Sequence, residues 1–159
     1  LGVYICNSKE EIAEAIQKVF TVDSSAFVET FVKGDEFTVG VLGVENPEAL
    51  PVIKIIPIHE FYDYESKYAE GGSQHICPAP LSEEDTIRAQ ELALSAHKVL
   101  GCKGVSRTDL IQDEKGEFWV LETNTLPGMT STSLLPDAAK VKGISFEELC
   151  SNMIYEALE

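Results

Sequence analysis

The sequence VSRTDLIQDEKGEFWVLETN, residues 105–124, predicts two short β-strands joined by a tight turn. Side chains alternate in character through both halves of this stretch, and in a strand every second side chain points to the same face. Between the halves, Asp113-Glu114-Lys115-Gly116 has the composition of a hairpin turn. We therefore expect the two strands to lie side by side and antiparallel.

The pairing register of this hairpin decides which side chains share a face. A four-residue loop would pair Gln112 with Glu117, and directly opposed residues share a face. Counting back from that pair gives three further pairs: Asp109 with Val120, Arg107 with Glu122, and Val105 with Asn124. One face would then carry these polar residues: Arg107, Asp109, Glu122 and Asn124. A slip of one residue would place them on opposite faces.

Two carboxylates and an amide oxygen on one face need a partner, because like charges about 4 Å apart repel by roughly 4 kcal/mol at an effective dielectric constant near 20. A divalent cation reverses the sign of that interaction. Oxygen ligands suit Mg²⁺ or Mn²⁺, and so few protein ligands suggest that phosphate oxygens complete the shell. The alternative is a cross-strand salt bridge between Arg107 and Glu122, with Asp109 in solvent.

The residues after the hairpin predict a turn and then a helix start. Pro127-Gly128 fits a type II turn, in which glycine supplies a positive φ, and glycine also lets a ligand approach its backbone N–H. The hydroxyl-rich residues 130–133 precede Leu134, and Pro136 fits a first helical turn, where N–H groups attract anions. A plain surface turn and a capping cluster alone are the alternatives. The succession of these features favours a functional site.

Residues 107–134 resemble the C-terminal part of D-alanine–D-alanine ligases, members of the ATP-grasp superfamily. Residues 61–68, FYDYESKY, resemble the mobile active-site loop of these enzymes, and Cys77-Pro78-Ala79 and residues 100–104, LGCKG, also match. The resemblance extends over essentially the whole chain. It implies an α+β ATP-grasp fold with a mostly antiparallel sheet flanked by helices. Residues 1–32 would be the tail of the central subdomain, and residues 33–159 the C-terminal subdomain with the metal site, the lid loop and the second-substrate site.

The resemblance also implies roles for the polar face. Asp109 and Glu122 would hold one Mg²⁺, and Glu122 and Asn124 a second, with Mn²⁺ as the other candidate metal. Arg107 and the Gly128 N–H would stabilise the oxyanion of a tetrahedral intermediate. These residues would therefore carry the chemistry of the reaction.

Substrate-binding roles follow from the same resemblance. Lys67 would reach the transferred phosphate of ATP, and Tyr68 would help to position the first D-alanine. Ser133 and the Leu134 N–H would hold the carboxylate of the second D-alanine. The nucleotide would be bound by these residues: Glu29, Thr30, Phe31 and Val32 at the adenine, and Glu36 at the ribose.

The implied activity is the ATP-dependent joining of two D-alanines through an acyl phosphate, for peptidoglycan precursor synthesis. In the family, the first-substrate domain, a glycine-rich loop and an ATP-binding lysine precede the region that corresponds to residue 1, and Leu1-Gly2 resembles the tail of that loop. We therefore expect this fragment alone to be inactive, and the resemblance allows a homodimeric full-length enzyme. The alternatives are another ATP-grasp ligase that joins a carboxylate to an amine, and a non-catalytic Mg·ATP-binding module.

The composition of the chain limits the classes of protein and of binding partner that remain possible. With 159 residues and 44% hydrophobic content, the chain suits one modest globular domain. The net charge of −15 argues against nucleic acid and anionic membranes as partners. The four cysteines form no C-x-x-C pair, which favours reduced thiols. The chain has no apolar run of membrane-spanning length and no signal peptide, so we expect a cytoplasmic location.

The rest of the chain predicts further strands and helices. Strands are expected over residues 26–32, 36–42 and 52–58, with a turn over residues 33–35. Helices are expected to begin at Ser8, Ser82 and Ser145, each followed three residues later by an acidic residue, as in a capped helix start. Gly101 would close the second helix. Its buried stripe would comprise Ala89, Leu92, Ala93, Ala96 and Leu100.

Overall fold

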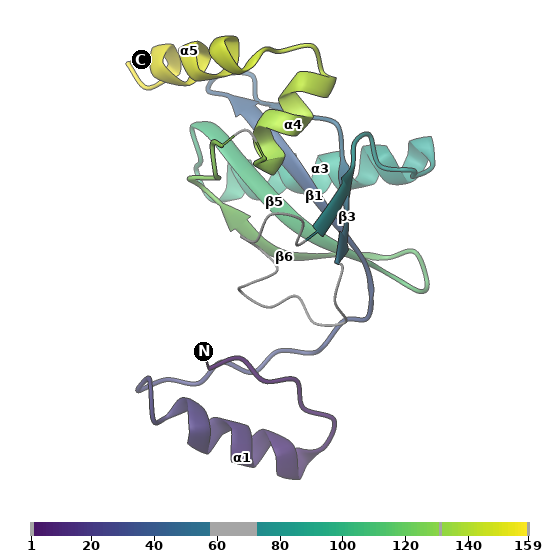
Figure 1. Cartoon of the computed structure of the whole chain (residues 1–159), viewed down its shortest axis with the longest axis vertical. Helices are drawn as coiled ribbons and strands as arrows, with labels where there is room; N and C mark the ends of the chain where they lie inside the picture. The colour runs from purple at the N-terminus through teal and green to yellow at the C-terminus, as the bar shows by residue number, and fades with distance from the viewer. Residues whose placement is uncertain (1, 58–72, 131, 159) are drawn as a thin grey trace. The chain divides into compact units, whose positions relative to one another are not determined.

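The structure, a computed structural model, describes residues 2–57, 73–130 and 132–158 (Figure 1). The chain divides into two compact units, Leu1–Val32 and Lys33–Glu159. That these units are the two subdomains expected from the sequence stays a prediction. Within the described residues, no helix is long and apolar enough to cross a membrane.

The first unit contains helix α1, Lys9–Val19. Ser8 caps it as expected, because its hydroxyl accepts a hydrogen bond from the Glu11 N–H at 3.2 Å. The Glu11 carboxylate accepts from the Asn7 N–H at 2.7 Å, one residue further back than a capping box requires.

The strand expected over residues 26–32 is wrong. Residues 25–33 have no regular secondary structure, and Phe27 and Phe31 are 86% and 65% exposed. A strand needs a hydrogen-bonded neighbour, and none of the described strands pairs with this segment. The apolar residues on both sides of Glu29 are therefore not enough to form a strand here.

The second unit is built on a six-stranded antiparallel sheet with the order β4-β3-β1-β5-β6, and β2 pairs with β1 at the side (Figure 1). The strands are β1 Gly34–Gly43, β2 Glu48–Ala49, β3 Ile53–Pro57, β4 Ser73–Ile76, β5 Gly104–Asp113 and β6 Phe118–Asn124. The α+β prediction with a mostly antiparallel sheet is confirmed. Gly34 and Asp35 belong to β1 and not to a turn, and β4 was not predicted.

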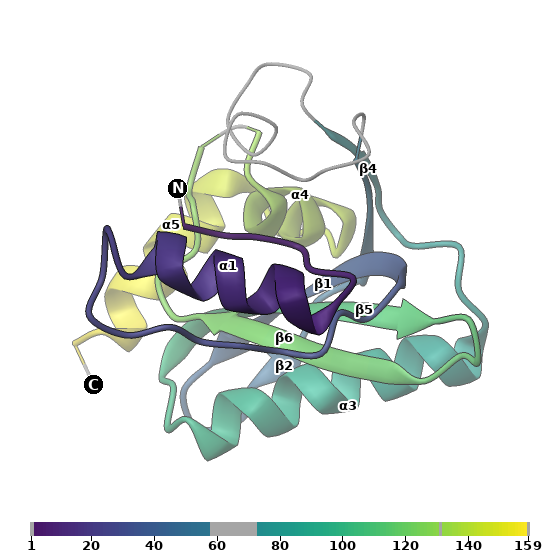
Figure 2. The same cartoon turned by 90° about the horizontal axis from the view of Figure 1, so that it is seen from below.

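Helices cover both faces of this sheet. Figure 2 shows α3, Glu83–Val99, on one side of the strands, with α4, Leu134–Val141, and α5, Phe146–Glu156, on the other side. Ser82 caps α3 and Gly101 follows its end with a φ of +65°, both as expected. The inclusion of Leu100 in the buried stripe is wrong, because Leu100 is the C-cap residue and is 59% exposed.

Each face of the sheet has its own hydrophobic core. The core against α3 contains Phe37, Val39, Val41, Val52, Ala89, Ala93 and Leu110. The core against α4 and α5 contains Leu50, Ile53, Val105, Leu135, Ala138, Ala139 and Leu149. Gly40 points to this second core, where a Cβ atom would lie 2.6 Å from Leu135 Cδ1. The missing side chain therefore lets α4 pack closely on β1.

The β5–β6 hairpin has a tighter loop than the sequence predicts. The Asp113 N–H donates to the Glu117 carbonyl at 2.9 Å, so only residues 114–116 form the loop. Gly116 has a φ of +82°, as the last position of a three-residue hairpin loop requires. The Asp113 carboxylate accepts hydrogen bonds from Trp119 Nε1 and from the Lys115 and Glu117 N–H groups, and these bonds lower the pKa of Asp113.

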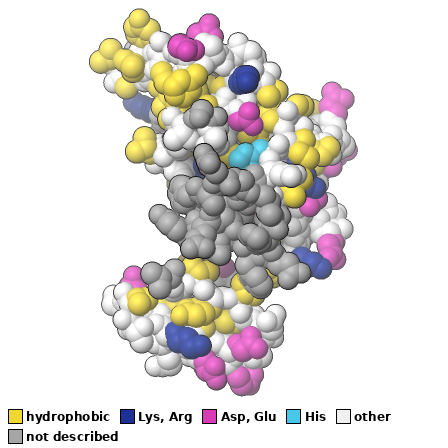
Figure 3. Space-filling view, in the orientation of Figure 1, with side chains coloured by type: hydrophobic (Ala, Val, Ile, Leu, Met, Phe, Trp, Pro, Cys, Tyr) yellow, Lys and Arg dark blue, Asp and Glu magenta, His cyan; other side chains and the backbone are white. Residues whose placement is uncertain are grey.

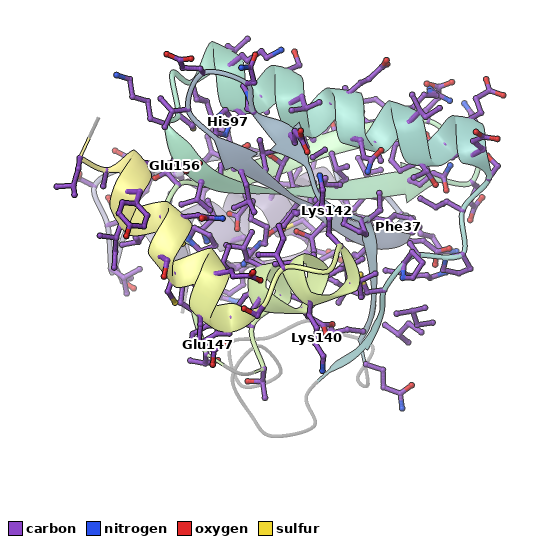
Figure 4. All side chains as sticks on the ribbon, turned by 90° about the horizontal axis from the view of Figure 1, so that it is seen from above. Phe37, His97, Lys140, Lys142, Glu147 and Glu156 are labelled. Atoms are coloured by element: carbon purple, nitrogen blue, oxygen red, sulfur yellow. The ribbon has the colours of Figure 1, made fainter. Side chains whose placement is uncertain are left out.

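Exposed apolar side chains occur at the C-terminal end of this unit, as they do elsewhere on it. The surface at the α4 and α5 end shows a group of hydrophobic side chains (Figure 3). Tyr155 is 70% exposed and Leu158 is 80% exposed. Lys142, the C-cap residue of α4 and labelled in Figure 4, forms an ion pair of 2.6 Å with Glu48 of β2. The hydrogen bond and charge of Lys142 lower the pKa of Glu48.

Candidate active site

The register of β5 and β6 differs from the predicted one. The observed pairs are Arg107 with Asn124, Thr108 with Thr123, Asp109 with Glu122, Leu110 with Val120, Ile111 with Trp119 and Gln112 with Phe118. The predicted pairs Gln112–Glu117, Asp109–Val120, Arg107–Glu122 and Val105–Asn124 are therefore wrong. Leu121 stands between the partners of Asp109 and Leu110 as the extra residue of a β-bulge.

The four polar residues nevertheless share one face as predicted, because two register shifts of one residue each cancel in their effect on which face a side chain takes. The shorter loop moves the register by one residue, which alone would turn β6 over. The bulge at Leu121 moves the register by one more residue, which turns Glu122 and Asn124 back to the face of Asp109. Glu122 therefore lies directly opposite Asp109, on the same face of the sheet, and Asn124 lies opposite Arg107.

Asp109 is held by hydrogen bonds to both of its carboxylate oxygens. Arg107 donates from Nε to Oδ1 and from Nη2 to Oδ2, both at 3.0 Å. Thr38, on the neighbouring strand β1, donates to Oδ1 at 2.6 Å. The side chains of Arg107 and Asp109 are only 14% and 18% exposed. The alternative with Asp109 in solvent is therefore wrong, and Arg107 forms its ion pair with Asp109.

The opposite face of the same strands is chemically different. Thr108 and Thr123 form a cross-strand pair there, with their hydroxyl oxygens 3.0 Å apart, and Thr108 is fully buried. Ser106 lies on this face too, against His97 of α3. The carboxylates of Asp109 and Glu122 thus lie on the face that α3 does not cover.

The donor set on the polar face fits a hard divalent cation. Asp109 and Glu122 occupy opposed positions, and Asn124 follows two residues later on the same face. Carboxylate and amide oxygens are suitable ligands for Mg²⁺ or Mn²⁺. Across residues 2–57, 73–130 and 132–158, no group of three or more His, Cys, Asp or Glu residues is arranged to bind a metal. A metal at this face would therefore depend on the Asn124 amide and on oxygens from a ligand.

The turn after β6 does not have the predicted geometry. Gly128 is absent from the described glycines with positive φ, so the type II assignment is wrong. A Cβ atom at Gly128 would lie 2.9 Å from Ser133 Oγ, so a side chain at this position would displace the Ser133 hydroxyl. Glycine therefore leaves room for that hydroxyl beside the turn.

The start of α4 has a backbone N-cap without a side-chain cap. Ser133 occupies the N-cap position, but its hydroxyl makes no capping bond within the described part of the chain. Instead, Ser133 Oγ accepts from the Thr130 N–H at 2.9 Å and lies 2.9 Å from Thr130 Oγ1. The capping-cluster alternative therefore fails for Ser133. The first turn of α4 offers backbone N–H groups at Leu134 and Leu135, of the kind that bind anions at helix starts, whereas Pro136 has none.

The same face of the sheet continues to β4, which the sequence reasoning missed. His75 pairs with Ile55 of β3 and faces the same side as Asp109. Burial lowers the pKa of His75, and the Asp137 carboxylate of α4 partly opposes this effect. Burial together with Asp137 raises the pKa of the Cys77 thiol to about 11. The Cys77 thiol is therefore protonated at neutral pH.

The structure brings together only part of the predicted site. Arg107, Asp109, Glu122 and Asn124 share one face, and a side chain at Gly128 would meet the Ser133 hydroxyl. Lys67 and Tyr68 lie outside the described residues. The predicted adenine-binding residues Glu29, Thr30, Phe31 and Val32 belong to the first unit, and Glu36 is on β1 of the second unit, so their role stays a prediction.

Thr38 is the residue near Asp109 that the sequence reasoning did not single out. It lies between Phe37 and Val39 on β1, and it is 1% exposed. The only feature of the sequence that could have indicated Thr38 is a hydroxyl side chain in the middle of a predicted strand, between two apolar residues. Its partner is 71 positions away in the chain, so no local pattern could identify the contact.

An antiparallel sheet with helices on both faces and two opposed carboxylates, Asp109 and Glu122, is consistent with the ATP-grasp fold. Residues 1–155 match the family described as "D-ala D-ala ligase C-terminus", and the chain belongs to this family. The D-alanine–D-alanine ligase of Carboxydothermus hydrogenoformans is 47% identical over 160 residues, which are 100% of this chain and 51% of that protein. The chain spans about half the length of the curated relatives it matches.

Solved structures show the same fold. The D-alanine–D-alanine ligase of Bacillus anthracis, complexed with ATP, superposes with a TM-score of 0.82 at 34% identity, over 99% of this chain and 51% of that one. The VanG D-Ala:D-Ser ligase of Enterococcus faecalis gives a TM-score of 0.77 at 34% identity, over 92% of this chain and 43% of that one. The fold is that of the ATP-grasp ligases, as expected from the sequence.

Proposed function

We propose that the full-length protein is an ATP-dependent D-alanine–D-alanine ligase that makes the dipeptide for peptidoglycan synthesis. The observation that carries this proposal is the shared face of Arg107, Asp109, Glu122 and Asn124, in a chain that belongs to the ligase family. ATP as co-substrate is supported by the Bacillus anthracis relative, which was solved with ATP.

The reaction must first activate a carboxylate, because attack by an amine on a carboxylate would have to expel oxide. Transfer of the ATP γ-phosphate to one D-alanine gives an acyl phosphate, and the amine of the second D-alanine then displaces phosphate. Phosphoryl transfer depends mainly on positioning and on neutralisation of charge. Asp109, Glu122 and Asn124 would hold two Mg²⁺ or Mn²⁺ ions, which supply that neutralisation when bound.

Arg107 and the Gly128 N–H are the groups proposed to stabilise the oxyanion of the tetrahedral intermediate. Loss of one such donor typically costs about 2.7–4 kcal/mol in the transition state. The side chain of Arg107 is only 14% exposed, which places its charge in a partly desolvated environment where it acts strongly. Its ion pair with Asp109 also fixes the guanidinium plane beside the proposed metal ligands.

The second substrate is proposed to bind by its carboxylate at the start of α4. Ser133 Oγ and the Leu134 N–H would donate to it, where the helix dipole favours an anion. Pro136 at the third helical position has no N–H to donate to Ser133, so the Ser133 hydroxyl does not cap it and its proton can be donated to a carboxylate. The remaining proposed contacts are Tyr68 at the first D-alanine, Lys67 at the transferred phosphate, and Glu29, Thr30, Phe31, Val32 and Glu36 at the nucleotide.

Phosphate release from Mg·ATP in the presence of D-alanine, measured on the full-length protein, tests this proposal. We expect Asp109→Asn and Glu122→Gln to reduce kcat by at least about 100-fold, because each removes an anionic ligand. Glu114→Gln is the matched control, since Glu114 lies in the loop of the same hairpin and its only described ion pair, with Lys33, is exposed. Undiminished activity in Asp109→Asn and Glu122→Gln would contradict the assignment.

The 159-residue chain by itself is expected to be inactive, because it covers about half of its relatives. The measurement is dipeptide formation by the purified chain next to the full-length protein at equal concentration. Dipeptide made by the chain alone would refute this expectation.

A second candidate is a ligase with another amine substrate. The similarity to the VanG D-Ala:D-Ser ligase supports this candidate, although the D-alanine–D-alanine ligases match over more of the chain. Competition between D-alanine and D-serine as second substrates, with mass analysis of the products, separates the two candidates. Binding of Mg·ATP without phosphate release for any amino acid would instead favour a non-catalytic module.

A further inference from the structure

Thr38 is a buried polar residue whose hydroxyl is directed at the polar face. The side chain is 1% exposed, and Thr38 is paired with Asp109 across β1 and β5. Its Oγ1 lies 2.6 Å from Asp109 Oδ1 and 3.2 Å from the Thr108 carbonyl oxygen. A hydroxyl has one proton to donate, and the shorter contact with the charged acceptor is the stronger one. The hydroxyl therefore donates mainly to Asp109.

The contacts of Asp109 leave one acceptor site open. A carboxylate offers about four lone-pair sites, two on each oxygen. Among the described residues, Oδ1 accepts from Thr38 and from Arg107 Nε, and Oδ2 accepts from Arg107 Nη2. Oδ2 therefore keeps one free site, while Oδ1 is saturated. A cation can approach Oδ2 without breaking any of these hydrogen bonds.

The two donors differ in how they affect a cation. The Arg107 guanidinium is itself positive and repels a metal ion bound to the same carboxylate. The Thr38 hydroxyl is neutral, so it can orient Asp109 without that repulsion. Thr38 also belongs to β1, whereas Arg107 belongs to β5, so the hydroxyl restrains the Asp109 carboxylate independently of Arg107. Partners of this kind commonly change metal affinity or activity by 10–100-fold when they are removed.

We propose that Thr38 is a positioning residue of the metal site: its hydroxyl holds Oδ1 of Asp109 and leaves Oδ2 as the oxygen that binds the cation. This inference rests on the proposed function, in which Asp109 is a metal ligand. Thr38 itself contacts neither metal nor substrate in this proposal, and it acts through Asp109.

The test is Mn²⁺ binding by the full-length protein in the presence of ADP, followed by the electron paramagnetic resonance signal of free Mn²⁺. No turnover is needed for this readout. Thr38→Val keeps the shape and removes the hydroxyl, and we expect it to weaken Mn²⁺ binding by about 10-fold or more. Thr38→Ser keeps the hydroxyl and should stay within about threefold of the unmodified protein. If Thr38→Val does not fold, Thr38→Ala against Thr38→Ser provides the same hydroxyl deletion.

Thr108→Val is the matched control. Thr108 is as buried as Thr38 and lies on the neighbouring strand, but its hydroxyl meets Thr123 on the opposite face. We expect this variant to lose a similar amount of thermal stability and to keep its Mn²⁺ affinity. Affinity unchanged in Thr38→Val, or lost equally in Thr108→Val, overturns the role of Thr38 while the proposed function stands. If the unmodified protein binds no Mn²⁺ with ADP, the proposed metal site fails together with this inference.

Discussion

His97 is a histidine enclosed between α3 and the sheet (Figure 4). Its side chain is 1% exposed, Nδ1 lies 2.8 Å from Ser106 Oγ, and Nε2 has no hydrogen-bond partner within the described residues. A buried N–H without a partner is rarer than a buried acceptor without one, so we assign the proton to Nδ1, which donates to Ser106. Burial, helped by the positive charge of Lys98, lowers the pKa of His97.

This histidine predicts a loss of stability in mild acid. Below about pH 6.5, the ordinary pKa of histidine, the unfolded chain takes up a proton that the folded chain resists. Above that pH, His97 should therefore cost the folded state no stability. The free energy of unfolding should decline as the pH falls from there toward the lowered pKa of His97 in the folded state. Urea unfolding of the 159-residue chain across this range measures the decline.

The control for this prediction is His97→Asn, which keeps a hydrogen-bonding group near Ser106 and removes the titration. We expect its profile to be flatter than that of the unmodified chain, since the remaining slope comes from other groups such as His75. An identical slope in both proteins would show that His97 does not contribute.

At the scale of residues, much of the candidate site could be predicted from the sequence. The four polar residues of β5 and β6 were identified by alternation within each strand, which depends only on local backbone geometry. The partners of each residue could not be predicted, because a bulge and a shorter loop depend on the packing of the whole hairpin. Thr38 could not be found for a related reason, since β1 and β5 are joined by long-range pairing.

At the scale of elements, α5 begins with a complete capping box. Ser145 Oγ accepts from the Glu148 N–H at 3.2 Å, and the Glu148 carboxylate accepts from the Ser145 N–H at 2.8 Å. These hydrogen bonds lower the pKa of Glu148. The helix also places Leu149, which is fully buried, against the core beneath α4. The start of α5 therefore supports the packing of the domain end.

Removal of this cap should be measurable. We expect Ser145→Ala to lower the free energy of unfolding by about 1 kcal/mol, because the Glu148 N–H loses its acceptor. Ser151→Ala is the matched control, since Ser151 is an exposed serine within the same helix. Its effect should stay within about 0.5 kcal/mol. Urea unfolding of both variants checks the difference, and equal effects would contradict the role of the cap.

Helix starts were predictable because a serine cap and an acidic partner lie within one turn of chain. The starts at Ser8, Ser82 and Ser145 all have the expected serine hydrogen bond. Strands were less predictable, because pairing decides whether a segment rich in apolar and β-branched residues becomes a strand. Residues 26–32 have the pattern without a paired neighbour, whereas β4 is a strand of only four residues with a polar start.

At the scale of the whole molecule, the net charge of −15 is the dominant electrostatic feature. Like charges on a compact chain repel and oppose folding. Raising the ionic strength from about 0.01 M to 0.1 M shortens the screening length from about 30 Å to 10 Å. We expect the melting temperature of the chain to rise by a few degrees, since about 1 kcal/mol corresponds to roughly 2–4 °C at this size.

A charge variant separates screening from other salt effects. Glu91→Lys replaces an exposed residue of α3 and reduces the magnitude of the net charge by two. Its melting temperature should respond less steeply to salt than that of the unmodified chain. A steeper or equal response would show that repulsion is not the cause.

The bulge at Leu121 also restricts how the hairpin can vary in length. A gain or loss of one residue between Asp113 and Glu122 would turn Glu122 and Asn124 toward the side covered by α3, whereas a change of two residues would leave them in place. Inherited insertions and deletions in this segment should therefore come in even numbers. A single deletion in the loop could survive only if the extra residue of the bulge were lost with it.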